Sequence, residues 1–305
     1  MKNNNVPLLR PVDLDKHHFG LTAQHPDFSP FYNIFHINRL ETYRDKILFP
    51  LPPHRKTVYD FIVLTKGSST RSKGLNNYTF KANTFFFLPA YQITTHESMS
   101  KNAEGFFCHF DIDIFNTYFP AYKNFEQFPF LQFNGEPIVM VDKKAMESVT
   151  NILSRLETEY NSKHIEKFDL VATYLLAIFL ELQRFVKQGA EVKKNAALFI
   201  TQQYKNMLAK NIYQNQRVTD YAKLLAVTSN HLNKCVKSIT GKSAQDLLNE
   251  MLLLEAKVLL KQTDLQISDI AFKLKEQNPG DFGRFFKSKT GTTPGKYRQM
   301  IDLAY

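Results

Sequence analysis

The sequence predicts an α+β protein in which a β-rich N-terminal region is followed by an all-helical C-terminal region. Short runs rich in Phe, Ile, Val, Tyr and Thr fill residues 31–141. Helical spacing of apolar residues begins at 142, and one helical pattern occurs twice between 218 and 291. The length of 305 residues suggests two domains.

The N-terminal region, residues 1–141, is predicted to be a β domain preceded by an arm. Residues 1–30 are polar with four prolines, so we expect little structure of their own there. Many short strands without helices between them favour a sandwich or small barrel. Which face of the Thr57–Leu64 strand points inward is not readable. The predicted strands are Phe31–Leu40, Thr57–Leu64, Asn77–Phe80, Thr84–Leu88, Gly105–Ile114 and Pro137–Val141.

Residues 142–189 are predicted to be a helical segment that mediates dimerisation. Its second helical run carries an apolar surface wider than one stripe, marked by Phe168, Leu175 and Leu182. Such a helix needs partners on more than one side, and a second copy of the chain is one candidate beside the β domain. Residues 190–195 are the predicted linker to a C-terminal domain at 196–305.

The C-terminal domain contains a duplicated helix-turn-helix pattern. Val218–Leu225 matches Ile267–Leu274 at an offset of 49, and Leu232–Gly241 matches Phe282–Gly291 at an offset of 50. Thr228 is expected to cap the second helix of the first copy, and Gly241 to end it. Asn278-Pro279 opens the equivalent helix of the second copy.

The helix after Thr228 separates its residues by chemistry. Helical spacing puts apolar residues on one face, expected to be core: Leu232, Cys235, Val236 and Ile239. The same spacing gives another face only amides and cations: Asn230, Asn233, Lys234 and Lys237. A polar-basic face presented twice favours DNA binding, although a helical bundle with a solvated basic face would produce the same pattern once.

Charge and cysteine usage agree with a polyanionic partner inside the cell. The net charge is +10, and residues 195–305 hold 16 Lys and Arg against 9 Asp and Glu. Cys108 and Cys235 lie at apolar pattern positions and are expected to be reduced core thiols. With no signal sequence and no apolar segment of spanning length, we expect a cytoplasmic protein without a membrane partner.

These residues resemble the AraC/XylS family of bacterial transcription regulators. The matching segments cover roughly 200–300 and read VTDYAKLLAV, SNHLNKCVKSITGKSAQDLLNEMLLLEAKVLL, ISDIAFKL and FGRFFKSKTGTTPGKYR. Pro53-His54-Arg55 and Phe86-Phe87-Leu88-Pro89 resemble the family's cupin-type sensing domain.

The resemblance implies a specific architecture and role. A cupin-like β-barrel with a helical dimerisation segment would precede an all-α domain in which a long helix joins two helix-turn-helix units. It also implies transcriptional control, usually activation, with double-stranded DNA, a homodimer partner, RNA polymerase and a small-molecule effector as partners.

The chain departs from the family pattern at three places. The turns, which usually carry Gly or Asn, have Ala226 and Lys275, and Glu276 stands where an apolar residue is usual. The segment Met251–Leu254 is wholly apolar where a phosphate-contacting basic residue is common.

The candidate DNA contacts follow from major-groove chemistry. Asn230 and Asn233 suit adenine, and Lys234 suits guanine or a phosphate. In the second unit Gly280 and Gly283 have no side chain to read with, so Arg284 is its candidate reader and discrimination is expected mainly from the first unit. His231 either reaches the DNA backbone or fills space beside the turn. The expected phosphate contacts are Ser229, His231, Lys237, Lys287 and Arg298.

No catalytic or metal site is legible. A metal-binding cupin needs clustered His and carboxylate ligands, but two residues after His54 the sequence has Lys56 instead of His, and His96 and His109 are unaccompanied. We therefore expect no enzyme activity, cofactor or metal, and the effector-lining residues are not readable. Two alternatives stay open: a cupin-type metal-dependent enzyme with a helical appendage, and a constitutive DNA-binding protein whose barrel serves only assembly.

Overall fold

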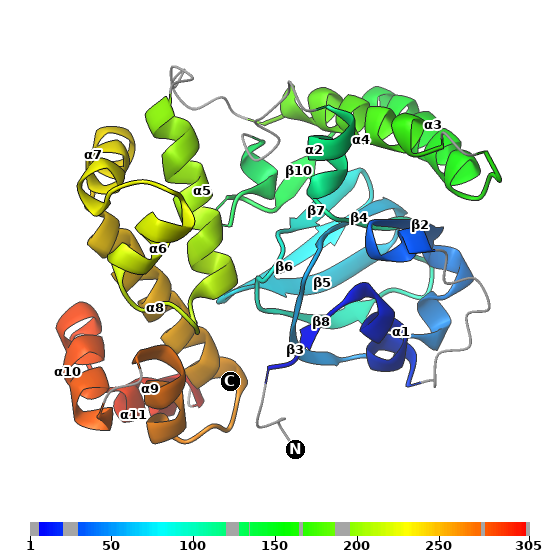
Figure 1. The fold of residues 1–305 in the computed structure, drawn as a ribbon. Coiled ribbons are helices and arrows are strands. Elements are labelled where there is room, and N and C mark those ends of the chain that lie inside the picture. Colours follow the sequence, from blue (N-terminus) through cyan, green and yellow to red (C-terminus); the bar gives the residue numbers. More distant parts are fainter. Residues whose placement is uncertain are drawn as a thin grey trace. The chain divides into compact units, whose positions relative to one another are not determined.

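The computed structural model describes residues 6–20, 30–119, 128–133, 135–164, 167–186, 196–275 and 278–302. The chain divides into two compact units (Figure 1). The β unit comprises Leu8–Lys73 and Asn77–Glu191, and the helical unit comprises Val192–Tyr305 with Met1–Pro7 and Gly74–Asn76. Sheets in the N-terminal half and helices at the C-terminus confirm the predicted α+β class. The predicted linker, 190–195, lies outside the described residues.

Two five-stranded sheets make up the β unit. The first has the order β1-β3-β8-β5-β6, with β1 parallel to β3. The second has the order β10-β7-β4-β9-β2 and antiparallel pairing. The first sheet's strands are β1 Leu8–Leu9, β3 Leu51–Lys56, β8 Thr94–Met99, β5 Ser68–Lys73 and β6 Asn76–Lys81. Those of the second are β10 Ile138–Met140, β7 Thr84–Leu88, β4 Tyr59–Lys66, β9 Glu104–Phe110 and β2 Phe35–Arg39.

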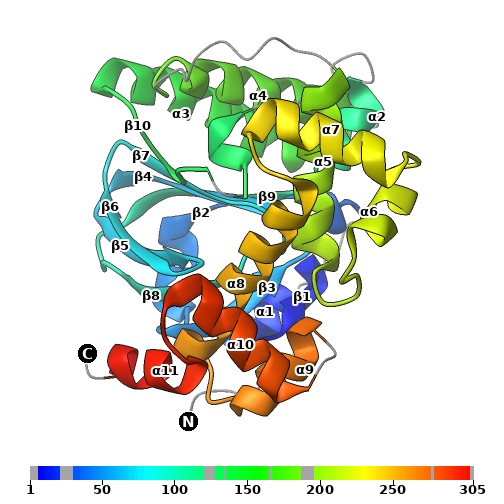
Figure 2. The same cartoon turned by 90° about the vertical axis from the view of Figure 1, so that its left-hand side faces the viewer.

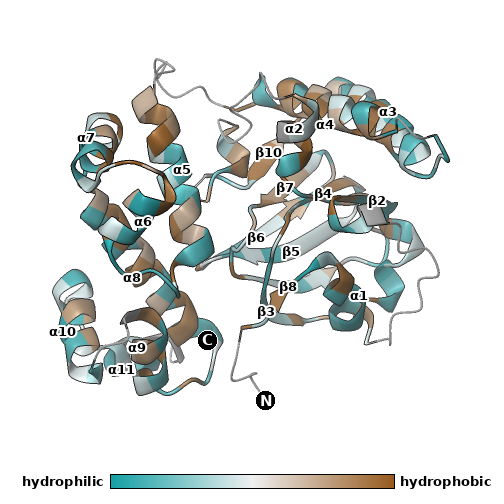
Figure 3. Ribbon diagram, in the orientation of Figure 1, coloured by the Kyte–Doolittle hydropathy of each residue, from teal (hydrophilic) through white to brown (hydrophobic). Residues whose placement is uncertain are grey.

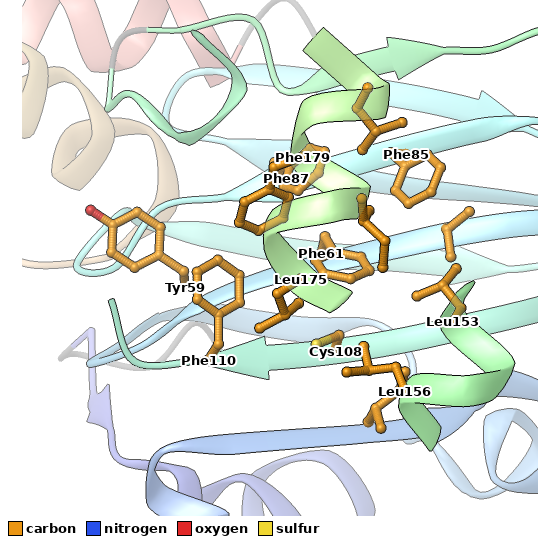
Figure 4. Close-up of a cluster of buried hydrophobic side chains, with 14 of the residues drawn as sticks. Tyr59, Phe61, Phe85, Phe87, Cys108, Phe110, Leu153, Leu156, Leu175 and Phe179 are labelled. Atoms are coloured by element: carbon orange, nitrogen blue, oxygen red, sulfur yellow. The ribbon is translucent and has the colours of Figure 1, made fainter. Parts of the chain in front are cut away.

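The central strand β4 has two buried faces. Tyr59, Phe61 and Val63 pack against helices α3 (Lys143–Tyr160) and α4 (Lys167–Gln183) in the larger apolar cluster (Figure 4). Ile62 and Leu64 point to the other side, where they cluster with Phe80 from the first sheet. The side of β4 that carries Asp60, Ile62 and Leu64 therefore faces the space between the sheets.

Helix α4 buries most of its apolar surface within the unit. Its predicted core positions from Phe168 to Leu182 are buried, but Leu170 and Leu180 are 44% and 43% exposed. The brown colouring along α4 in Figure 3 shows how little of this helix is polar. Among the described residues, no helix is both long and apolar enough to span a bilayer.

The prediction that residues 1–30 have little structure of their own is wrong for residues 11–19, which form helix α1 (Pro11–Phe19). Pro11 occupies the first turn, where a missing N–H costs nothing, and Gly20 ends the helix with a left-handed φ of 67°. The Asp13 carboxylate accepts from the Arg10 backbone N–H at 2.9 Å. Pro11, one of the prolines from which we predicted a structureless arm, therefore starts a helix.

Shorter helical segments complete the β unit. Helix α2 spans Asp113–Tyr118. Phe115 of this helix and the preceding Phe110 belong to the larger apolar cluster. The 3₁₀ segments are Pro30–Asn33, Leu40–Thr42, Arg44–Lys46 and Pro129–Leu131. Both cysteines of the chain are free and buried, as predicted.

The helical unit is built around the long helix α8, which runs from the α5–α7 group to α9 and α11 (Figure 2). Buried aromatic residues anchor both halves, Tyr204 and Tyr221 on one side and Phe282 and Phe286 on the other. The helices are α5 Ala196–Asn211, α6 Val218–Leu224, α7 Ser229–Thr240, α8 Ala244–Gln262, α9 Ile267–Lys275, α10 Pro279–Thr290 and α11 Pro294–Asp302.

Candidate nucleic-acid interface

Helix α7 is held at both ends by the residues that the sequence predicts. The Thr228 hydroxyl accepts from the His231 backbone N–H at 3.1 Å, and Gly241 closes the helix with φ of 73°. The turn before it contains Ala226 with φ of 53°, a left-handed conformation that costs an L-residue about 1–2 kcal/mol relative to Gly. The first helix-turn-helix unit therefore keeps the left-handed turn without the usual glycine.

The two faces of α7 differ as predicted. Leu232, Cys235 and Val236 are buried, whereas Ile239 is half-buried. Asn230, His231, Lys234 and Lys237 are exposed. Figure 3 shows both the hydrophilic and the hydrophobic colours along α7. An amide, an imidazole and two ammonium groups are thus available on one helix whose opposite side is fixed in the core.

Asn233 differs from Asn230 in having a structural partner. It is half-buried, and its Oδ1 accepts from the backbone N–H of Ala244 at 3.0 Å. Ala244 is the first residue of α8, where backbone N–H groups have no partner within the helix. Asn233 therefore joins α7 to α8, and only its amide nitrogen remains for another contact.

The N-terminal turn of α7 carries two further predicted contacts. Ser229 is half-buried and His231 is exposed. The His231 Nε2 lies 3.6 Å from the Cys235 Sγ, one turn further along. This ring therefore lies along the helix beside the turn while still exposed, which keeps both readings of His231 open.

The second helix-turn-helix unit has the same kind of helix cap as the first, but its exposed helix face carries different side chains. The Asn278 side chain accepts from the Gly280 N–H at 2.8 Å, so α10 begins as predicted. Arg284 is exposed and forms an ion pair with Asp281 on the same helix. Lys287 is exposed, and its ammonium group makes no hydrogen bond among those the structure describes. The turn residues 276 and 277, including Glu276, lie outside the described part of the chain.

Arg298 has a structural role that differs from the predicted phosphate contact. Its Nε donates to the Leu260 carbonyl at 3.2 Å, and its Nη1 donates to the Leu265 carbonyl at 2.8 Å. Its Nη2 is buried as well. The guanidinium group thus ties α11 to the end of α8 through two of its three nitrogens.

A cavity of about 520 Å³ lies in the β unit and was not predicted from the sequence. Aromatic side chains including Tyr32, Phe107 and Tyr160 line it together with charged Lys56 and Arg71. The lining combines apolar and aromatic side chains with many polar and charged ones, and small-molecule sites use both kinds of group. The sequence feature that could have indicated this cavity is the presence of charged residues within predicted strands or next to them.

A buried ion triad lies beside this cavity, and two of its members, Lys56 and Arg71, line it. The Lys56 Nζ lies 2.6 Å from the Asp60 Oδ2, and the Arg71 Nη1 lies 2.6 Å from the Asp60 Oδ1. Burial lowers the pKa of Lys56 to about 8. Burial alone would raise the pKa of Asp60, but the two neighbouring cations outweigh it and lower that pKa. One carboxylate therefore pairs with two cations beside the cavity, which leaves the triad with a net positive charge.

His54 is not isolated, contrary to the expectation from its neighbours in the sequence. The structure brings His17 and His18 of α1 to within reach of it, with ring centroids 4.5 Å and 5.7 Å from that of His54. His109, likewise expected to be unaccompanied, lies 5.3 Å from His36 between ring centroids. His17 and His18 reach His54 because α1 packs beside β3, whereas His36 and His109 are paired across β2 and β9.

Comparison with known proteins addresses the helical unit most directly. Residues 221–300 match a family described as "Helix-turn-helix domain". The chain carries an AraC-type helix-turn-helix domain at its C-terminus.

Two relatives from Bacillus subtilis and one solved structure are similar to the chain. The uncharacterized HTH-type transcriptional regulator YfiF is 22% identical over 256 residues, which cover 81% of this chain and 78% of that protein. The uncharacterized HTH-type transcriptional regulator YtdP is 35% identical over 106 residues, or 32% of this chain and 14% of that protein. The structure of ToxT from Vibrio cholerae has 14% identity and a TM-score of 0.38, covering 88% of this chain and 98% of that chain.

The AraC-type domain contains both capped helices. The matched range begins at Tyr221 in α6 and extends into α11, so it includes all of α7 and α10. The polar faces of α7 and α10 thus belong to the AraC-type domain, whereas the cavity and the three histidines lie in the β unit.

Proposed function

We propose that this protein is a sequence-specific DNA-binding transcriptional regulator that reads the major groove with α7 and α10. The observation that carries the proposal is the exposed face of α7, where Asn230, Lys234 and Lys237 stand opposite a buried apolar face. Amides recognise adenine edges and ammonium groups recognise guanine or phosphate. The match of residues 221–300 to a helix-turn-helix family supports the same function.

The first unit supplies most of the sequence discrimination in this proposal. Asn230 and Lys234 read bases, and Lys237 holds a phosphate. Ser229 and His231 lie at the N-terminal turn of α7, where backbone dipoles favour a phosphate. Asn233 contributes its free amide nitrogen and keeps α7 in place through Ala244.

The second unit mainly positions the protein on the duplex. Gly283 has open space around it and no side chain for base contacts. Lys287 holds a phosphate, and Arg284 must exchange its pairing with Asp281 for a base or phosphate contact. Discrimination at the second half-site is therefore weaker than at the first.

Helix α8 sets the distance between the two reading helices. Its 19 residues give a length of about 28 Å at 1.5 Å per residue. Two major-groove contacts on one face of B-DNA lie ~34 Å apart, one helical turn. A connector of this length suits two helices that enter successive grooves.

The β unit is proposed to regulate DNA binding through dimerisation and an effector. The exposed Leu170 and Leu180 on α4 offer an apolar surface for a second copy of the chain. The cavity of about 520 Å³ has the size and lining for a small molecule. An effector at a free concentration of 100 times its Kd would stabilise the folded state by about 2.7 kcal/mol. A thermal-shift screen of metabolites detects a stabilisation of this size. RNA polymerase is the proposed target of the DNA-bound form.

Genome-wide mapping of bound DNA tests the function. Wild-type protein is expected to occupy discrete sites that share a sequence motif, and Asn230→Ala is expected to lose the preference at one position of that motif. Uniform occupancy without a shared motif, for wild type and variant alike, would contradict sequence-specific regulation. Sedimentation of the full chain tests the dimer separately, since Leu170→Glu should shift it toward monomer.

A further inference from the structure

Three histidines of the β unit converge on one point. Strand β1 pairs in parallel with β3, with Leu8 opposite Arg55 and Leu9 opposite Lys56. Helix α1 follows β1 directly and so lies beside β3, which brings His17 and His18 to His54. One ring nitrogen from each of the three lies within 4.8 Å of the other two.

Hydrogen bonds fix which nitrogen of two rings carries the proton. The His54 Nδ1 lies 2.8 Å from the Pro52 carbonyl, and the His18 Nδ1 lies 2.7 Å from the Leu14 carbonyl. A carbonyl only accepts, so both Nδ1 atoms are donors and both Nε2 atoms carry a lone pair. Metal-ligating histidines commonly bond a backbone carbonyl through their other nitrogen in this way.

The inner nitrogens of the cluster are buried without a hydrogen-bond partner among the described residues. They are the Nε2 of His54 and both ring nitrogens of His17. His54 is fully buried, so its Nε2 lone pair is removed from bulk water. A buried polar nitrogen with no partner is destabilising, and a ligand that accepts its lone pair removes that cost.

We propose that His17, His18 and His54 bind one divalent transition-metal ion such as Zn²⁺. The Nε2 atoms of His18 and His54 and one ring nitrogen of His17 are the ligands. At a Zn–N distance of about 2.0–2.1 Å, tetrahedral ligand nitrogens lie about 3.3 Å apart, so the rings must close in by about 1 Å. His17, which has no hydrogen bond to its ring among the described residues and is only half-buried, has the freedom to move.

The surroundings suit three neutral imidazoles and one open coordination position. Burial lowers the pKa of His17 to about 4 and the pKa values of His18 and His54 well below their usual value. Lys56, whose charge acts on all three rings, is bonded to Asp60 at 2.6 Å, which offsets that charge. His18 and His54 line the cavity, so a fourth ligand can reach the ion from there. The inference does not depend on the proposed DNA binding.

Metal titration of the purified full chain tests the site. After removal of metals with a chelator, Zn²⁺ is titrated by calorimetry and Co²⁺ by visible absorption, which reports tetrahedral coordination. The variants His54→Asn and His18→Asn keep a donor near Nδ1 for the carbonyl but lose the Nε2 ligand. His164→Gln, which changes an exposed histidine after α3, is the matched control.

The expected result is one ion per chain in wild type and in His164→Gln, with affinity reduced at least about 100-fold in His54→Asn, His18→Asn and His17→Gln, since even outer-shell changes cost 10–100-fold. Far-UV circular dichroism without metal checks the fold of each variant. If the His54 variant does not fold, His17→Gln decides, because that ring makes no hydrogen bond to lose. Absence of saturable binding to wild type, or equal affinity in His17→Gln and wild type, would overturn the proposal.

Discussion

The two asparagines of α7 are predicted to fail in different ways when they are replaced by alanine. The Asn230 side chain is exposed and makes no hydrogen bond among those described, whereas the Asn233 Oδ1 accepts from Ala244 N–H at 3.0 Å. Asn230→Ala should therefore leave the fold unchanged and relax DNA specificity at one base pair by about 1–3 kcal/mol. Asn233→Ala should destabilise the helical unit.

The size of the Asn233 effect follows from the group that loses its partner. Ala244 is fully buried, and its N–H lies in the first turn of α8. Leaving a buried donor unsatisfied costs about 1–3 kcal/mol. For a unit of roughly 100 residues, each kcal/mol lowers Tm by about 4–8 °C. We expect the Tm of the helical unit to fall by about 4–24 °C in Asn233→Ala.

Thermal unfolding and DNA binding should be measured on the same full-length preparations. Far-UV circular dichroism follows the helical unit, and fluorescence anisotropy measures the affinity for a selected duplex and its single-base variants. Asn230→Ala should show a wild-type Tm and a flattened preference at one position. Asn233→Ala should show a lowered Tm and weaker binding to all the duplexes.

The reversed pattern would refute this reasoning. A wild-type Tm for Asn233→Ala would mean that its bond to Ala244 does not stabilise the junction of α7 and α8. A lowered Tm for Asn230→Ala would mean that its side chain is part of the packing rather than free to meet a base.

Four further outcomes are expected. Asp60→Asn leaves two buried cations unbalanced and should cost about 3–5 kcal/mol in urea unfolding, whereas Glu157→Gln, which breaks a half-exposed pair, should cost at most about 1 kcal/mol. Burial lowers the pKa of Lys73 to about 7, so the unfolded state binds more protons above that pH, and the unfolding free energy should rise as pH increases from about 7 to 10.5. Lys73→Met should remove the part of this rise that begins near pH 7, while Lys56, with a pKa lowered to about 8, keeps a rise above that pH. Lys287→Ala should weaken binding to all duplexes alike and lower the salt slope by about 1; an unchanged slope would exclude a phosphate contact. Arg298→Met should lower Tm without changing the salt slope, and the reverse result would restore Arg298 as a phosphate contact.

The helical unit was largely predictable because its signals are local. The Thr228 and Asn278 caps, the left-handed Gly241 and the buried face of α7 each depend on residues within one helix or its ends. The duplicated pattern then gave a second view of the same arrangement. Ala226 could be predicted to be left-handed only from its place in that pattern.

The first sheet of the β unit was harder to predict because its interior is polar. Strands β3, β5 and β8 were missed, and they carry Lys56, Arg71 and Thr94 toward one another rather than alternating apolar residues. Two prolines in β3 also argued against a strand. Only the three-dimensional pairing of these charges explains why they are tolerated inside.

Long-range partners account for the remaining differences. Nothing near Asn233 or Arg298 in the sequence indicates that Ala244 or the Leu260 and Leu265 carbonyls will bond to them. The histidine cluster was missed because it requires α1, and the prolines of that segment were interpreted as breaking structure rather than starting it.

Charge reversal on α7 tests DNA recognition most directly. Lys234 and Lys237 are exposed, so the double variant Lys234→Glu/Lys237→Glu should keep the fold. The control, Lys143→Glu/Lys144→Glu, makes the same change of net charge at the exposed start of α3. By fluorescence anisotropy on a selected duplex, the α7 variant should bind roughly 100-fold more weakly or worse and lose about 2 from the salt slope, while the control stays within about threefold of wild type. Equal losses in the two double variants would contradict recognition through α7.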